Sequence, residues 1–259
     1  MPRSIEEAKV FDKANGNHLW MDAFKLEMTN LGVAFHILED DEPVPPGWSQ
    51  SSGHLIWDVK MDFARKARWV KDGHKEADPE HSNFAGVVAR DSIRIALTYG
   101  ALNDLDVVAA DIRSAYLQAP SSARDYIICG PEFGVNAGKK ALIKRALYGG
   151  KTAGRDFWLH LRSCMKHLGF QSCLADPDVW MREGEKPSGE KYWEFVLLYT
   201  DDCLCISHKG ESVLRNEIGK YFKLKEKSIG PPSQYLGGKL CKVQLKNGAY
   251  AWAFGYSQY

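Results

Sequence analysis

Two adjacent aspartates, Asp201 and Asp202, interrupt an otherwise apolar stretch between residues 196 and 207. The apolar runs on both sides have the length and composition of buried strands, and a two-residue link suits a tight antiparallel turn. Two like charges held between buried strands repel each other and resist desolvation. The pattern therefore indicates either a carboxylate site for a hard cation such as Mg²⁺ or a solvated hairpin tip with turn-forming residues.

The chain has 259 residues, enough to bury a core in one large domain or two small ones. A net charge of +1 excludes a whole-chain electrostatic argument for nucleic acid, so any basic footprint is local. The first residues lack a signal-peptide core, and no apolar run approaches membrane-spanning length. Cysteines without a C-x-x-C pair indicate reduced thiols. We expect an intracellular protein, cytoplasmic or nuclear, with no membrane partner.

Composition shifts divide the chain into three segments. Residues 1–50 are expected to be a helical lead-in, because a capping-box pattern starts at Ser4 and apolar residues from Trp20 to Leu31 follow helical spacing. An acidic and proline-rich stretch at 39–47 ends it. Residues 51–245 then form the main domain, and residues 246–259 form a truncated C-terminal segment.

Basic residues gather in two places. A predicted hairpin at 55–70 and its continuation form either a charged, solvated sheet edge or a phosphate-facing surface. Its basic residues are Lys60, Arg65, Lys66, Arg68, Lys71 and Lys75. Residues 139–155 contain no acid and include a glycine turn before Lys151 and a predicted helix. Such a turn either binds phosphate or simply starts a helix, and it does not match a P-loop.

Asp111 ends a near-continuous apolar strand predicted at 106–112. It is either the N-cap of the following helix or a site residue. Asp201 follows ninety residues later. Three carboxylates brought together would need a metal to remain ionised, and a two-metal carboxylate site suits nucleotidyl transfer.

Eight short motifs occur in one order, and with them the chain resembles the reverse transcriptase of copia-type LTR retrotransposons. Residues 66–74 resemble K-A-R-L-V-x-x-G, residues 110–117 resemble D-V-x-x-A-[FY]-L, and residues 199–202 resemble Y-V-D-D. The remaining matches are residues 91–94 (T-S-I-R), 146–151 (x-L-Y-G-L-K), 168–170 (L-G-F), 175–180 (S-D-x-x-[LV]-[FY]) and 235–238 (Y-L-G-[IM]).

The resemblance implies an α+β fold of the right-hand polymerase type. It would have a palm, made of an antiparallel sheet backed by helices, and fingers, with thumb and RNase H lacking or truncated. It implies that Asp111, Asp201 and Asp202 are the catalytic carboxylates. Together with the Ile112 carbonyl they would bind two Mg²⁺ ions, with Mn²⁺ as a substitute.

The resemblance also implies contacts to nucleotide and primer. The nucleotide-binding residues would be Lys66, Arg68, Ile112, Tyr116, Tyr148, Gly149 and Lys151. Tyr116 would lie under the sugar of the nucleotide, where its ring excludes a 2′-OH. Leu236, Gly237 and Gly238 would hold the primer end.

The implied function is RNA-directed DNA polymerase, which transfers a nucleotide from dNTP to a primer 3′-OH. Its partners would be an RNA template, a DNA or tRNA primer and dNTP. Integrase and RNase H would lie elsewhere in the Pol polyprotein, and the setting would be a cytoplasmic virus-like particle or the nucleus.

Three departures keep an alternative open. Thr200 replaces the usual Val, and Gly150 and Gly154 stand where Leu and Pro are common, which loosens a loop. The alternative is a non-catalytic, truncated or decayed remnant that at most binds nucleic acid. An unrelated metal-dependent nuclease is disfavoured by Tyr116 and the Asp-Asp hairpin.

Overall fold

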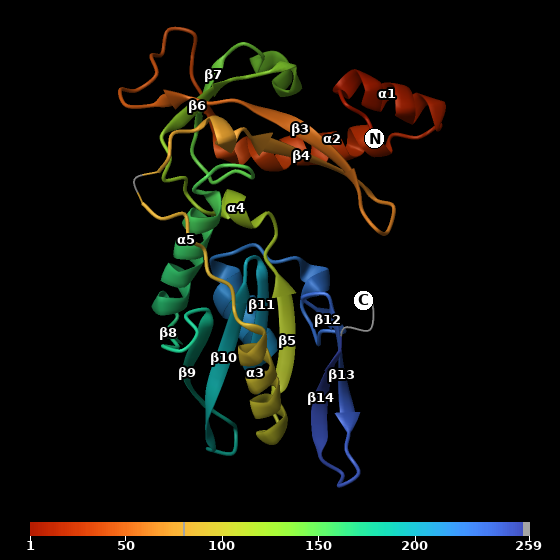
Figure 1. The fold of residues 1–259 in the computed structure, drawn as a ribbon, viewed down its shortest axis with the longest axis vertical. Helices are drawn as coiled ribbons and strands as arrows, with labels where there is room; N and C mark the ends of the chain where they lie inside the picture. Colours follow the sequence, from red (N-terminus) through yellow and green to blue (C-terminus); the bar gives the residue numbers. More distant parts are fainter. Residues whose placement is uncertain (80, 256–259) are drawn as a thin grey trace. The chain divides into compact units, whose positions relative to one another are not determined.

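The computed structural model describes residues 1–79 and 81–255, which form two compact units of mixed α/β structure (Figure 1). The first unit comprises Met1–Phe84 and Tyr116–Phe157. The second comprises Ala85–Ala115 and Trp158–Tyr259. The units interleave along the chain, which the composition shift at residue 50 could not indicate.

The first unit contains two sheets and two N-terminal helices. One sheet has the order β1-β7-β6-β2, with β2 parallel to β6, and the other is the antiparallel β3–β4 hairpin. Its strands are β1 (Phe35–Ile37), β2 (Ser49–Gln50), β3 (Gly53–Val59), β4 (Arg65–Lys71), β6 (Asp125–Ile128) and β7 (Lys140–Ile143). Its helices are α1 (Ile5–Ala14), α2 (Leu19–Leu31), η1 (Gly32–Ala34), η2 (Gly73–Lys75) and η3 (Pro131–Asn136), and α4 (Ala115–Gln118) begins at its boundary.

The N-terminal helices pack against the β3–β4 hairpin. The helix start predicted at Ser4 is confirmed, because the Glu7 N–H donates to the N-cap Ser4 Oγ over 3.1 Å, whereas the Glu7 carboxylate accepts the Arg3 N–H rather than that of Ser4. Trp20 of α2 meets the Trp57 ring edge-on, with ring centroids 5.9 Å apart. The Trp69 N–H donates to Glu27 over 2.9 Å. The helical lead-in is therefore an integral part of the first unit.

Lys71, at the end of β4, is a buried cation with two acidic partners. Its side chain is only 3% exposed, and its ammonium lies 2.5 Å from both Glu76 Oε1 and Asp125 Oδ2. Its backbone N–H donates to the Tyr148 carbonyl over 2.8 Å. For Lys71, both alternatives, a solvated sheet edge and a phosphate-facing surface, are therefore wrong, because its side chain is buried and its charge is neutralised by two carboxylates.

The second unit is built on a five-stranded antiparallel sheet with the order β5-β11-β10-β9-β8. Its strands are β5 (Asp106–Asp111), β8 (Gln171–Ser172), β9 (Val179–Glu185), β10 (Lys191–Tyr199) and β11 (Asp202–Ser207). A second sheet contains β12 (Gln234–Tyr235), β13 (Gly238–Gln244) and β14 (Tyr250–Gly255). The helices are α3 (Arg90–Leu102), α6 (Gly210–Ser212), η4 (Val213–Glu217), η5 (Ile218–Lys220) and η6 (Glu226–Ser228), and α5 (Ala153–His167) begins in the first unit and ends in the second.

Helix α3 packs against both sheets of the second unit, through β14 and through β11 and β5 (Figure 1). Its buried residues Ile93 and Leu97 share a core with Leu204 and Ile206 of β11. Asp91 lies in the first turn of this helix. The Asp176 carboxylate, which is distant in sequence, accepts the N–H of the N-cap residue Ala89 over 2.9 Å.

The segment from residue 213 to residue 222, whose apolar residues follow helical spacing, does not form a regular α-helix. Val213, Leu214, Ile218 and Phe222 are buried while Tyr221 is exposed, and the chain forms a π-helical turn at Val213–Glu217 and a 3₁₀ turn at Ile218–Lys220. Apolar spacing indicates which residues of such a segment are buried, whereas its hydrogen-bond pattern depends on packing.

Lys71→Met should lower the free energy of unfolding by about 3 kcal/mol, because it leaves Glu76 and Asp125 as buried carboxylates without their cation. Urea unfolding followed by circular dichroism measures the change. The matched control is Lys75→Met: the Lys75 side chain is 59% exposed, and its ion pair with Asp72 should contribute about 1 kcal/mol or less. Equal losses in the two variants would contradict this account of Lys71.

Candidate functional site

The aspartate hairpin is built from β10 and β11. Tyr199 pairs with Asp202, so the two turn residues are Thr200 and Asp201. The prediction of an Asp-Asp turn was therefore wrong by one residue, and Asp202 is the first residue of β11. Thr200 has φ = 53°, a left-handed value at the first turn position, as in type II′ turns. A β-branched residue is strained there, because its Cβ crowds the backbone.

Strand β11 places Asp202 directly opposite Asp111. The β5–β11 register begins with the pair Asp202↔Asp111, and the Ile112 N–H donates to the Asp201 carbonyl over 2.8 Å. The three predicted acidic residues thus meet at one end of two neighbouring strands. Asp111 ends β5, and its Oδ2 accepts a hydrogen bond from Lys225 Nζ over 2.6 Å.

Ionisation of all three carboxylates, those of Asp111, Asp201 and Asp202, is electrostatically unfavourable because they are close together and partly buried. Burial, together with the neighbouring carboxylates of Asp201 and Asp111, raises the pKa of Asp202 to about 6, although Lys225 partly lowers it. Cys203, which follows on β11, is buried, and burial raises the pKa of its thiol well above the usual range. The carboxylates therefore border a low-dielectric core, where a bound cation would be needed to neutralise their negative charge.

The donor set suits a divalent cation in its chemistry. Carboxylate oxygens are the ligands that Mg²⁺ prefers, and Asp111 Oδ1 is buried without a hydrogen-bond partner among the described residues. Across residues 1–79 and 81–255, however, no group of three or more His, Cys, Asp or Glu side chains is arranged to hold one metal ion. The residue types present are suitable ligands for the ion, but the carboxylate of Asp111 is paired with Lys225.

Three of the predicted nucleotide-binding residues stack together in the first unit. The Arg68 guanidinium lies over the Tyr148 ring, 5.7 Å from its centroid. Tyr148 packs against Tyr116 with ring centroids 4.8 Å apart, and Tyr116 meets Phe157 at 6.0 Å. Lys66, in the same strand as Arg68, pairs across the hairpin with Asp58. The stack holds the Tyr116 ring between two aromatic neighbours.

The glycine turn before α5 packs tightly on the end of β4. Gly149 has φ = 85°, and a Cβ at this position would clash with the Lys71 carbonyl oxygen. Gly73 approaches the Gly149 carbonyl equally closely. Gly149 is therefore required by a backbone contact as well as by its dihedral angle.

Lys151 has protein partners of its own. Its ammonium donates to the Glu76 carbonyl and to Asp78 Oδ1, each over 2.8 Å. It also lines a polar pocket of about 530 Å³ with Lys75, Arg124 and Arg155. These contacts favour the alternative in which the glycine turn simply starts helix α5.

The predicted primer-binding residues form the turn between β12 and β13. Tyr235 pairs with Gly238, and the two turn residues Leu236 and Gly237 have φ values of 47° and 78°. Both values are left-handed, as in a type I′ hairpin. Gly238 admits no side chain, since a Cβ would meet the Phe254 ring.

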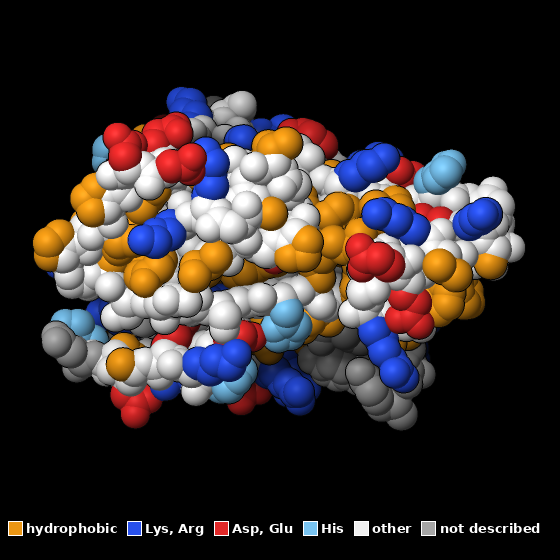
Figure 2. Space-filling view, turned by 90° about the horizontal axis from the view of Figure 1, so that it is seen from above, with side chains coloured by type: hydrophobic (Ala, Val, Ile, Leu, Met, Phe, Trp, Pro, Cys, Tyr) orange, Lys and Arg blue, Asp and Glu red, His pale blue; other side chains and the backbone are white. Residues whose placement is uncertain are grey.

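The predicted basic surfaces are partly neutralised. Lys75 pairs with Asp72 over 2.8 Å, and Lys139 lies within 3.8 Å of both Glu39 and Asp40. On the face seen in Figure 2, acidic, basic and apolar side chains are interspersed rather than separated by sign. Any phosphate binding there depends on individual residues, not on a uniform positive field.

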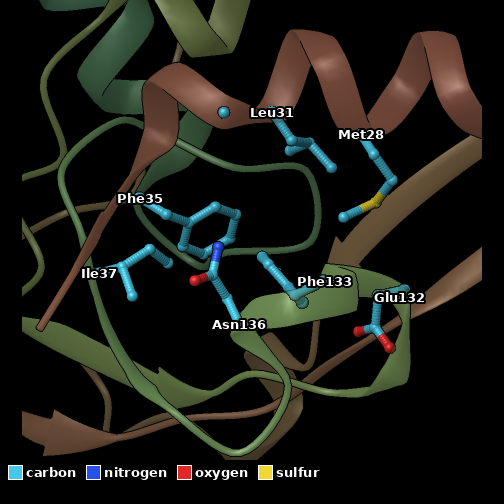
Figure 3. A pocket seen from close by; sticks show the side chains of 8 residues that line it. Met28, Leu31, Phe35, Ile37, Glu132, Phe133 and Asn136 are labelled. Carbon is cyan, nitrogen blue, oxygen red and sulfur yellow. The ribbon is translucent and has the colours of Figure 1, made fainter. Parts of the chain in front are cut away.

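One apolar pocket contains none of the predicted site residues. It has a volume of about 280 Å³, and the side chains of Phe35, Phe133 and Glu132 are among its lining (Figure 3). Glu132 Oε1 accepts the indole N–H of Trp69 over 3.0 Å. The lining comes from separate segments without a shared motif, so no sequence signal identified it.

Comparisons with known proteins agree with this arrangement. A family model described as reverse transcriptase (RNA-dependent DNA polymerase) matches residues 38–252. The chain is 31% identical over 93% of its length to the retrovirus-related Pol polyprotein from transposon TNT 1-94 of Nicotiana tabacum, and covers 18% of that protein. It is 24% and 25% identical to the Pol polyproteins from transposons RE2 and RE1 of Arabidopsis thaliana, over 78% and 59% of its own length and 14% and 10% of theirs.

The chain thus spans less than a fifth of the length of these relatives.

Among the helices of the described residues, none combines the length and the apolar content that crossing a bilayer requires.

Thr200→Gly should raise the free energy of unfolding by about 1 kcal/mol, because glycine adopts φ = 53° without steric strain. Thr200→Asn should give a smaller gain, since asparagine tolerates the left-handed region. Thr200→Val is the matched control, because it keeps the β-branch and should leave stability unchanged. Chemical denaturation measures the free energy of unfolding of all three variants. A gain in stability for Thr200→Val equal to that for Thr200→Gly would contradict the proposed backbone strain at this position.

Proposed function

Because this chain belongs to the reverse transcriptase (RNA-dependent DNA polymerase) family, we propose that it is the RNA-directed DNA polymerase domain of a copia-type retrotransposon Pol polyprotein. The observation that supports this most directly is the pairing of Asp202 with Asp111, beside Asp201, at one end of β5 and β11. Distant parts of the sequence are brought together there as adjacent carboxylates. Nucleotidyl transfer uses such an acidic group.

The acidic residues would hold two Mg²⁺ ions, or Mn²⁺ in their place. Asp111, Asp201 and Asp202 would supply side-chain oxygens, and Ile112 its carbonyl. When bound, the ions would activate the primer 3′-OH and neutralise the leaving phosphate oxygens. The role of the chain is to hold these oxygens on paired strands, where the sheet restricts their movement.

The first unit would recognise the nucleotide. Lys66 and Arg68 are cations on β4 that would contact the triphosphate, and Tyr148 supports the Arg68 guanidinium. Tyr116 would lie under the sugar and exclude a 2′-OH, with Tyr148 and Phe157 holding its ring. Gly149 would keep the turn close to β4.

Lys151 has a more structural role in this proposal. Its contacts with Glu76 and Asp78 would hold the segment after β4, so that its part in nucleotide binding is indirect. The turn formed by Leu236, Gly237 and Gly238 would contact the primer end.

In this proposal the second unit is the palm and the first unit contributes the fingers. The RNA template, a DNA or tRNA primer and dNTP are the proposed substrates. Integrase and RNase H would be supplied by other parts of the polyprotein, and a cytoplasmic virus-like particle or the nucleus would be the setting.

A non-catalytic remnant is the second candidate. The contact between Lys225 and Asp111 favours it, because a carboxylate that is held by an ammonium is not a ready metal ligand. The two candidates differ in whether the acidic residues support synthesis.

Extension of a DNA primer on an RNA template with Mg²⁺ and dNTP tests the proposal. Asp201→Asn should reduce extension by ~100-fold or more, because it removes a carboxylate charge from the proposed site. The matched control is Asp106→Asn, an exposed residue at the opposite end of β5, which should leave extension unchanged. Both the chain itself and a longer form containing the following polyprotein segment should be assayed.

Loss of extension in both variants would contradict the assignment of Asp201. If neither the chain nor the longer form extends a primer, the remnant is the correct interpretation.

A further inference from the structure

A short segment after η5 runs beside the end of β5 and extends the sheet locally. The Arg113 N–H donates to the Lys223 carbonyl over 2.8 Å, and the Lys225 N–H donates to the Asp111 carbonyl over 2.9 Å. Ile112 and Leu224 therefore form an antiparallel bridge. The backbone of Lys225 is held in register with the residue that ends β5.

Two further contacts anchor the same segment. The Asp111 N–H donates to Ser228 Oγ over 2.9 Å, and Ala109 and Gly230 exchange backbone hydrogen bonds of 2.8 and 3.2 Å. The position of Lys225 thus follows from contacts on both sides of it, so its side chain is directed from a fixed backbone.

The Lys225 side chain binds the first of the three acidic residues. Its ammonium lies 2.6 Å from Asp111 Oδ2, while the other oxygen of that carboxylate is buried without a hydrogen-bond partner among the described residues. The Asp111 side chain is 26% exposed, and that of Lys225 is 49% exposed. The cation can therefore leave toward solvent, whereas the carboxylate is held at the end of its strand.

We propose that Lys225 is a placeholder cation, which neutralises Asp111 when no divalent ion is bound and must release it before Asp111 can act as a metal ligand. This inference rests on the proposed function, since it concerns the same acidic residues. Lys225 then sets the metal concentration that the site requires: the ion pair stabilises the metal-free sheet end, and its rupture opposes metal binding.

Binding of Mn²⁺ alone to the purified chain tests the inference without measuring synthesis. Isothermal titration calorimetry or the loss of the free Mn²⁺ paramagnetic resonance signal gives the affinity. Lys225→Met should bind Mn²⁺ about three- to ten-fold more tightly than the unmodified chain, which is the effect of removing one partly exposed, charge-assisted hydrogen bond.

Three further variants separate this contact from other effects. Lys227→Met removes the same charge two residues away from an exposed position that makes no ion pair within the described part of the chain, and it should leave affinity unchanged. Lys225→Arg keeps the charge and should resemble the unmodified chain. Asp111→Asn should weaken Mn²⁺ binding, and circular dichroism shows whether each variant is folded.

The outcomes distinguish the inference from the proposed function. If the unmodified chain binds Mn²⁺ through Asp111 and Lys225→Met changes nothing, or if Lys227→Met gives the same gain, the placeholder role is wrong and the proposed metal site stands. If no variant binds Mn²⁺ in an Asp111-dependent way, both the metal site and the placeholder role are wrong. A gain confined to Lys225→Met supports both.

Discussion

The pairing of β11 with β5 is the interaction on which the acidic group depends. It places Asp202 opposite Asp111, and like charges in directly opposed positions destabilise a sheet. A shift of this register by one residue would turn every side chain of β11 to the other face. The buried residues Leu204 and Ile206, which pack against α3, oppose such a shift. The apolar core thus maintains an electrostatic arrangement that would not form by itself.

Positive charge and backbone strain meet at the same end of this sheet. Lys225 compensates Asp111 from a segment that the sheet itself orders, and Thr200 holds a left-handed turn that leads into Asp202. Strain of this kind persists only where surrounding structure enforces it, and it is frequent at functional sites. The long β10–β11 pairing provides that enforcement here.

Much of the local structure could be predicted from the sequence. The β3–β4 hairpin, the strand ending at Asp111 and the helix after the glycine turn all lie where apolar periodicity placed them. The wrong predictions concern the ion-pair partners of individual side chains. Lys71 was interpreted as a surface cation, yet it is buried between the nearby Glu76 and Asp125, which comes from a distant segment. Periodicity reports which side of an element is apolar, but it does not report which distant charge the opposite side meets.

The sequence by itself determined the family and the residue types of the site, because ordered motifs and adjacent acids are local properties of the chain. Only the tertiary structure decided that Asp111 faces Asp202, that Lys225 binds Asp111 and that Lys151 is held by Glu76 and Asp78. These contacts join residues from about 70 to more than 110 positions apart. Strand register and the burial of charge depend on the whole core, so no local pattern encodes them.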